Sequence, residues 1–185
     1  MTVSPRATRL RSGPLPAAEW QRFLDTFLYR PEAVLIDEIV RVERASGEIE
    51  ARLDTTRALP YSDAQRVRPE HPAHVSAAEL LMATGSLGCL HAFLFHGCDW
   101  ERGWTGFGNR IHRADFRGLV RRGPPLELHS RETKRRVGPR RVVLRFEFRF
   151  VQEGALVYLG DQSAMFLRGL PGAAAPEESG ETSRR

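Results

Sequence analysis

The sequence is poor in the residues that mark several large classes of protein. Cysteine occurs twice in 185 residues, as Cys89 and Cys98, and Lys134 is the only lysine. Two cysteines nine positions apart, on what we expect to be one helix, lie too far apart for a disulfide bond and are too few for a zinc site. We therefore expect buried free thiols, no metal site and no cofactor.

Long apolar runs are also scarce. No stretch reaches the roughly 20 consecutive apolar residues that span a bilayer, and residues 1–11 lack the apolar segment of a signal peptide. We therefore expect a cytoplasmic protein without a membrane span.

Arginine supplies almost all of the positive charge, and the net charge is +5. Such a surface favours anionic partners through long-range electrostatics. Nucleic acid would suit the same charge, but the chain has no helix-turn-helix, zinc-finger or aromatic RNA-binding pattern. We therefore expect no nucleic-acid binding.

The composition divides the chain into one domain between two polar ends. Residues 1–16 are rich in Arg, Ser, Thr and Pro, and residues 169–185 are polar and rich in helix breakers. We expect both ends to be disordered tails. Residues 17–168 then form a single domain, since about 150 residues can enclose one hydrophobic core.

Hydrophobic periodicity predicts the elements of this domain. Residues 17–29 carry apolar side chains at i, i+3, i+4, i+7 and i+8, as an amphipathic helix does. Residues 33–54 have strand-like patterns on both sides of a Ser-Gly turn and predict a hairpin. Residues 75–95 are apolar or small all round, so a helix there must be buried. Residues 110–167 predict three or four antiparallel strands with short turns, which gives an α+β fold.

The segment around the start of the buried helix carries the candidate catalytic residues. His71 and His74 lie in the loop that leads into the helix, and Glu79 lies in its first turn. An imidazole and a carboxylate near a helix end can act as general base and general acid, or activate a water. The free N–H groups of the helix start are suited to polarising a carbonyl group.

A purely structural interpretation of the same residues stays open. The segment from Ser76 through Ala77 to Glu79 matches an S-x-x-E capping box, in which the two end residues exchange hydrogen bonds with each other's amides. Such a cap contributes about 1 kcal/mol and needs no catalytic role. The amides that it uses would be unavailable to a substrate.

On these segments the chain resembles the hotdog-fold acyl-thioester enzymes. The relevant families are the FcoT-like long-chain acyl-CoA thioesterases and, more distantly, the FabA/FabZ-type β-hydroxyacyl carrier-protein dehydratases. The resemblance is carried by VLIDEIV at residues 34–40, by H-x4-E-L from His74 to Leu80, and by ADFRGLVRRGPPLEL at residues 114–128. It implies a hotdog fold, in which an antiparallel sheet wraps one long helix, here with an extra N-terminal helix, and a homodimer.

The resemblance also implies a function. We expect hydrolysis of an acyl-CoA or acyl-carrier-protein thioester in fatty-acid or polyketide-type metabolism, with Glu79 activating water and His74, or His71, assisting proton transfer. One alternative is dehydration or hydration of a β-hydroxyacyl thioester by the same residues. Another is a non-catalytic acyl-binding or scaffold protein.

Further residues are candidates for binding the substrate. Tyr61, Ser76, Ala77 and Gly85 would line the acyl site, although the FcoT-like thioesterases carry amide side chains where Ser76 and Gly85 stand and a tyrosine where Cys89 stands. Arginines of the predicted strand and turn would meet phosphates of the thioester or an acidic carrier protein. These are Arg110, Arg113, Arg117, Arg121 and Arg122. The alternative for them is a solvated strand face.

Overall fold

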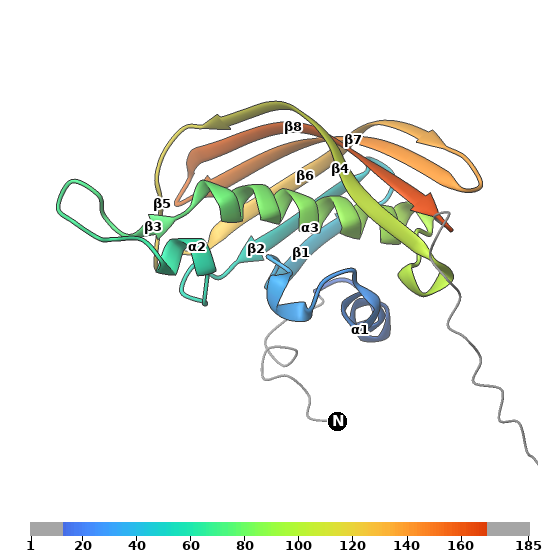
Figure 1. The fold of residues 1–185 in the computed structure, drawn as a ribbon, viewed down its shortest axis with the longest axis horizontal. Coiled ribbons are helices and arrows are strands. Elements are labelled where there is room, and N and C mark those ends of the chain that lie inside the picture. Colours follow the sequence, from blue (N-terminus) through green and yellow to red (C-terminus); the bar gives the residue numbers. More distant parts are fainter. Residues whose placement is uncertain (1–12, 170–185) are drawn as a thin grey trace, which may run out of the picture.

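A curved antiparallel sheet dominates the computed structural model, which describes residues 13–169 (Figure 1). Its six strands follow the order β1-β2-β6-β7-β8-β4. They are β1 (Glu38–Glu43), β2 (Glu48–Leu53), β4 (Trp104–Phe116), β6 (Leu126–Val137), β7 (Arg141–Gln152) and β8 (Ala155–Arg168). All neighbouring strands pair antiparallel, and β4 forms one edge of the sheet beside β8.

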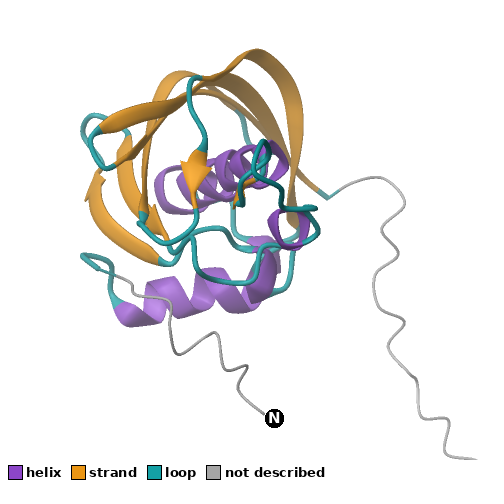
Figure 2. Ribbon diagram, turned by 90° about the vertical axis from the view of Figure 1, so that its left-hand side faces the viewer, coloured by secondary structure: helices purple, strands orange, loops and turns teal. Residues whose placement is uncertain are grey.

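The long helix α3 (Ala77–His96) lies inside the curve of the sheet (Figure 2). It begins at Ser76, whose hydroxyl accepts a hydrogen bond from the amide of Ala78 at 3.1 Å, and it ends at Gly97, which has a positive φ of 61°. Glycine adopts this left-handed conformation without steric cost, so it stops the helix. The predicted α+β arrangement of one buried helix and one antiparallel sheet is confirmed.

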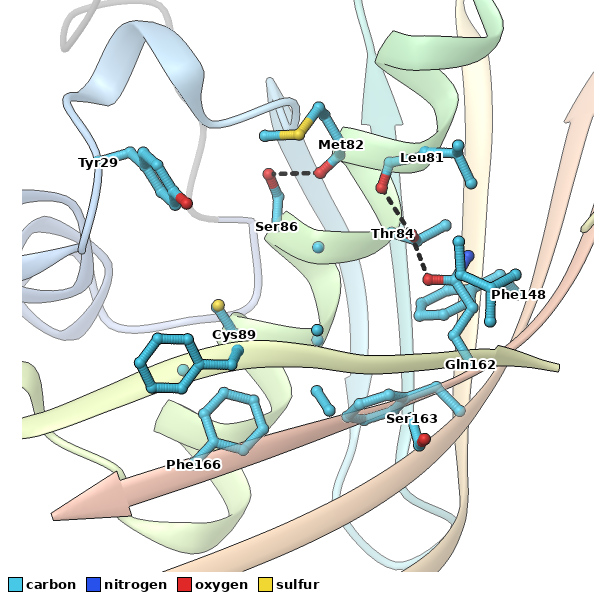
Figure 3. Close-up of a pocket in the computed structure, with 18 of the residues that line it drawn as sticks. Tyr29, Leu81, Met82, Thr84, Ser86, Cys89, Phe148, Gln162, Ser163 and Phe166 are labelled. Atoms are coloured by element: carbon cyan, nitrogen blue, oxygen red, sulfur yellow. Dashed lines mark hydrogen bonds between the residues drawn. The ribbon is translucent and has the colours of Figure 1, made fainter.

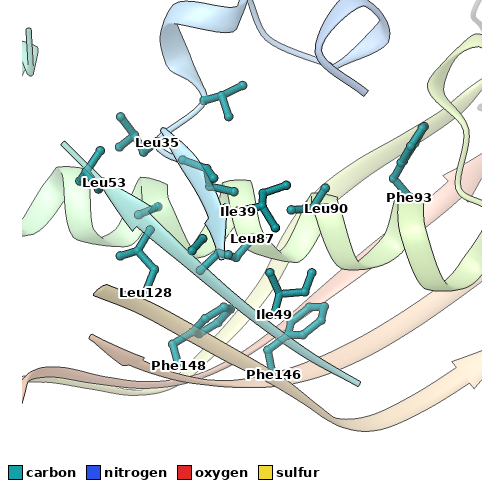
Figure 4. Packing of buried hydrophobic residues seen from close by; sticks show 14 of the residues in the cluster. Leu35, Ile39, Ile49, Leu53, Leu87, Leu90, Phe93, Leu128, Phe146 and Phe148 are labelled. Atoms are coloured by element: carbon teal, nitrogen blue, oxygen red, sulfur yellow. The ribbon is translucent and has the colours of Figure 1, made fainter. Parts of the chain in front are cut away.

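The core lies between α3 and the concave face of the sheet (Figure 4). Leu87 and Leu90 of α3 meet this face, where Phe146 and Phe148 alternate along β7 with the outward-facing Glu147. Alternation with a period of two places one face of a strand in the core and the other in water. The predicted pattern of β7 is therefore confirmed.

The expectation that no stretch is long and apolar enough to span a bilayer is wrong for α3. Among the described residues, this helix alone is long and apolar enough to cross a membrane by length and composition. Small residues such as Gly85 interrupt its strictly apolar runs, so no single run in the sequence has the full length of a span. Because 67% of this apolar stretch is buried inside the fold, α3 has the character of a core helix.

The helix α1 (Ala17–Thr26) packs across the side of α3 that the sheet leaves open (Figure 1). The Phe23 ring contacts the Phe93 ring edge-on at 5.4 Å, and Arg22 forms an ion pair with Asp99. The helix ends at Thr26, earlier than the predicted Tyr29, because Phe27 has an extended ψ of 150°.

Short elements complete the described chain. They are η1 (Pro31–Ala33), α2 (Pro60–Asp63), β3 (His74–Val75), η2 (Trp100–Arg102) and β5 (Val120–Arg121). The strands β3 and β5 pair with each other at the entry to α3. Most of the two predicted tails, at residues 1–12 and 170–185, lies outside the described residues.

Candidate functional site

A cavity of about 280 Å³ lies between α3 and the sheet, under β4 (Figure 3). Its walls are mainly apolar and aromatic, and come from α3, β4, β7, β8 and the segment after α1. Phe146, Phe148 and Phe166 line its inner part, whereas Met82 and Phe107 line it and are also exposed to solvent. Small-molecule sites in proteins are commonly mostly apolar hollows of this kind.

Two glycines of the cavity wall border open space. A Cβ atom placed on Gly85 of α3 or on Gly108 of β4 would meet no atom within 4 Å. By contrast, a Cβ atom on Gly88 would lie 3.4 Å from the Phe146 ring. Gly85, which the sequence analysis placed among the substrate-binding residues, therefore lies on the cavity wall.

The polar groups of the cavity centre on Gln162 of β8 (Figure 3). Thr84 Oγ1 lies 3.0 Å from Gln162 Oε1 and 2.6 Å from the carbonyl oxygen of Leu81, and Gln162 Nε2 lies 2.9 Å from the Tyr158 hydroxyl. Tyr158 is fully buried, and burial raises the pKa of its hydroxyl. Gln162 was not among the predicted site residues. It follows the inward-facing Tyr158 and Gly160 of β8 at intervals of two residues, so strand alternation places it on the core side.

The Cys89 thiol also lines the cavity. Burial raises the pKa of this thiol to about 12, with a smaller contribution from Cys98. The thiol is therefore protonated at neutral pH and is a poor nucleophile. Both cysteines are free, and Cys98 is buried as expected.

The carboxylate of Glu79 has all its contacts inside the protein. Oε1 accepts hydrogen bonds from the amides of Tyr61 at 2.7 Å and Ser62 at 3.1 Å, and Oε2 accepts one from the Ser62 hydroxyl at 2.8 Å. Glu79 is only 2% exposed. The carboxylate thus holds the first turn of α2 against α3.

The predicted capping box is wrong in both of its hydrogen bonds. Ser76 is the N-cap of α3, but its hydroxyl accepts from the amide of Ala78 and not from that of Glu79. The Ser76 amide donates to the Ser62 hydroxyl at 2.8 Å and not to Glu79. Glu79 is turned towards α2, whose amides at Tyr61 and Ser62 need an acceptor. These amides lie 18 and 17 residues before Glu79, so the sequence around Ser76 could not predict this contact.

The predicted pairing of a histidine with Glu79 is not formed within the described residues. Nδ1 of His74 lies 2.8 Å from the carbonyl oxygen of Pro72, and the rings of His71 and His74 meet edge-on at 5.1 Å. His71 is exposed and His74 is half-buried. His71 lies in the loop between α2 and β3, which extends away from the sheet in Figure 1, and His74 is the first residue of β3. Neither residue lines the cavity.

The remaining predicted residues lie outside the cavity. Tyr61 is exposed, and Ala77 is exposed at the first turn of α3. Arg113 and Arg117 both pair with Asp115, and the hydrogen bond from Arg113 lowers the pKa of that carboxyl group. Because their partner is local, these arginines have the surroundings of a solvated strand face.

Comparison with known proteins gives a likeness in structure alone. No protein-family model matches the chain, and no curated protein matches its sequence. The solved structure of thioesterase HI1161 from Haemophilus influenzae is 17% identical and has a TM-score of 0.52, over 83% of this chain and 94% of that chain. A mutant of thioesterase PA1618 from Pseudomonas aeruginosa is 13% identical with a TM-score of 0.53, over 81% of this chain and 94% of that one.

The PaaI protein from the phenylacetic acid degradation operon of E. coli is also similar. It is 15% identical, with a TM-score of 0.50, over 82% of this chain and 94% of that chain. At these identities the shared property is the path of the chain, with one long helix enclosed by an antiparallel sheet. The protein has the hotdog fold, as the resemblance in sequence predicted.

Proposed function

We propose that this protein binds an acyl thioester with the acyl group in the cavity beside α3 and hydrolyses it. The observation that carries this proposal is the cavity itself: an apolar space of about 280 Å³, with Gly85 and Gly108 in its wall. Burial of an acyl chain there would contribute about 0.8 kcal/mol for each CH₂ group removed from water. The thioesterase structures of the same fold support hydrolysis as the reaction.

The direction of binding follows from the exposed part of the cavity. Met82, Phe107 and Ile111 line it and are between 43% and 55% exposed, so the cavity opens to solvent beside them. The acyl chain would occupy the aromatic inner part, and the polar carrier would remain outside. The carrier is either coenzyme A or an acyl carrier protein.

Hydrolysis also needs a group that activates water. Among the described residues, the cavity wall carries no carboxylate and no imidazole. We propose that a homodimer supplies this group, with His74, or its neighbour His71, of one copy reaching the cavity of the other. Glu79 would then be a positioning residue, because it fixes α2 and with it the start of the loop that carries these histidines.

Thiol release from a panel of acyl-CoA and acyl-carrier-protein thioesters tests the proposal. We expect release with the wild type, and little with Gly85→Leu, because the new side chain would fill the open space at the cavity wall. Gly85→Ala is the matched control, since it adds one carbon and should retain most of the activity with short acyl groups. His74→Ala should reduce the turnover number by about 10²-fold or more, as loss of a general base does.

A second candidate function is acyl binding without catalysis. It is favoured by the Glu79 carboxylate, whose two oxygen atoms are both hydrogen-bonded within the protein. In this case acyl thioesters would bind, Gly85→Leu would abolish binding, and no thiol would be released. Dehydration of a β-hydroxyacyl thioester would differ from both, since an enoyl product would form while the thioester stayed intact.

A further inference from the structure

The Gln162 amide is held between two hydroxyl groups at the wall of the cavity (Figure 3). Thr84 contacts one end of the amide and Tyr158 the other, at 3.0 Å and 2.9 Å. The surrounding wall includes the rings of Phe146 and Phe148. A polar group in such surroundings is costly to bury unless its hydrogen bonds are satisfied.

The hydrogen atoms of the two hydroxyl groups determine which way round the Gln162 amide can make its hydrogen bonds. The Thr84 hydroxyl has one hydrogen atom, but two acceptors face it, the Leu81 carbonyl oxygen and Gln162 Oε1. A half-turn of the amide would exchange its nitrogen and oxygen atoms. Thr84 would then donate to Leu81 and accept from Gln162, and the Tyr158 hydroxyl would donate to the amide oxygen. This orientation satisfies both hydroxyl groups.

One donor is left over in either orientation. A glutamine amide has two N–H donors, and the hydroxyl on its nitrogen side accepts one of them. The second N–H has no acceptor among the described residues, and the amide to which it belongs lines the cavity. Gln162 is half-buried, so water can reach this N–H while the cavity is empty. A ligand that displaces this water without supplying an acceptor would leave the donor unpaired at a cost of about 1–3 kcal/mol, so a ligand that supplies an acceptor there is favoured.

We propose that Gln162 is a specificity-determining residue, whose spare amide N–H binds an oxygen atom carried by the acyl group itself. The preferred ligand is then an acyl thioester with an oxo or hydroxyl group on its chain, and an unsubstituted chain of the same length binds more weakly. This inference rests on the proposed binding of acyl thioesters. Thr84 and Tyr158 are positioning residues, because they hold the amide in place.

The test compares acyl-CoA thioesters of one chain length, unsubstituted or with an oxo or hydroxyl group at successive carbons. Equilibrium dissociation constants are measured by calorimetry for the wild type, Gln162→Met and Gln21→Met. Gln162→Met keeps the length of the side chain but removes the donor, and Gln21→Met is the matched control on the exposed face of α1. Melting temperatures establish that each variant is folded.

We expect the wild type and Gln21→Met to bind at least one oxygenated thioester about tenfold more tightly than the unsubstituted one, as one added hydrogen bond can provide. Gln162→Met should lose this preference and bind the unsubstituted thioester at least as well as the wild type does. If Gln162→Met does not fold, Thr84→Val serves instead, since it releases the amide from one partner and should weaken the preference.

Three results would contradict the inference in different ways. Equal affinities of the wild type for every chain would overturn the role of Gln162 and leave the proposed function intact. An equal loss for all thioesters in Gln162→Met would mean that the N–H binds the thioester carbonyl, which also overturns the inference. No binding of any acyl thioester would overturn the proposed function as well.

Discussion

The histidine at position 91 shows how burial alone sets the properties of a side chain. His91 is 0% exposed, its Nε2 lies 2.8 Å from the Ser130 hydroxyl, and its Nδ1 has no hydrogen-bond partner. Burial, with a smaller effect of His96, lowers the pKa of His91 from 6.5 to about 3. The imidazole is therefore neutral in the folded protein over most of the acidic range.

A pH dependence of stability follows from this pKa. Below pH 6.5 the unfolded chain binds a proton at His91 and the folded chain does not, so this histidine favours unfolding increasingly as the pH falls towards 3. Its contribution to the free energy of unfolding should fall by up to about 1.4 kcal/mol per pH unit in this range. Urea unfolding at pH 7, 5 and 4 measures the effect.

The variant His91→Gln should have a shallower dependence on pH than the wild type. Glutamine can still donate to Ser130, but it does not titrate. His112→Gln, at an exposed position of β4, should keep the slope of the wild type. Equal slopes in all three proteins would show that His91 is charged in the folded state.

At the scale of elements, the contact between α2 and α3 depends on one carboxylate. Glu79→Gln should lower the free energy of unfolding by about 1–3 kcal/mol, because charge-assisted hydrogen bonds to Tyr61 and Ser62 are weakened. Thiol release by the folded variant should fall less than tenfold. Loss of a general base would instead cost 10²-fold to 10⁴-fold.

Unfolding by urea and steady-state thiol release at a temperature where both proteins are folded separate these two roles. The control is Glu70→Gln, in the exposed loop between α2 and β3, which should change neither quantity. An unchanged stability together with a hundredfold loss of activity would return Glu79 to the catalytic role first predicted for it.

The elements themselves were largely predictable, because periodicity is a local property of the sequence. The alternation in β7 and the apolar character of α3 come from neighbouring residues, and both predictions are confirmed. The start of β4 was placed too late, at Arg110 instead of Trp104. Glycines at 106 and 108 have the pattern of a loop, yet this segment pairs with β8, and only that distant partner makes it a strand.

At the scale of the whole molecule, the site could not be predicted in the same way. Thr84 and Gln162 meet although 78 residues separate them, and Glu79 meets Ser62 across 17 residues. Such contacts depend on how the sheet curves around α3, and the sequence pattern near each residue does not indicate them. Glu79 was therefore recognised from the sequence as a residue of the helix start, whereas its partners Tyr61 and Ser62 were not.

The edge of the sheet leads to a prediction for the assembly. Among the described residues β4 pairs with β8 on one side only, and its Phe107 and Ile111 side chains are 45% and 55% exposed. Exposed apolar groups on an unpaired edge strand are typical of a surface that another chain covers. Both residues also line the cavity, so a second copy bound here would lie beside the proposed acyl site.

We therefore expect the protein to be a homodimer that associates through β4. Sedimentation velocity should show a dimer for the wild type and a monomer for Ile111→Lys, because the lysine would bury a charge in the interface. Val137→Lys, at an exposed apolar position of β6, is the matched control and should remain dimeric. The monomeric variant should also lose thiol release, since the proposed site draws its histidines from the second copy. A wild type that stays monomeric, or an active Ile111→Lys monomer, would contradict this assembly.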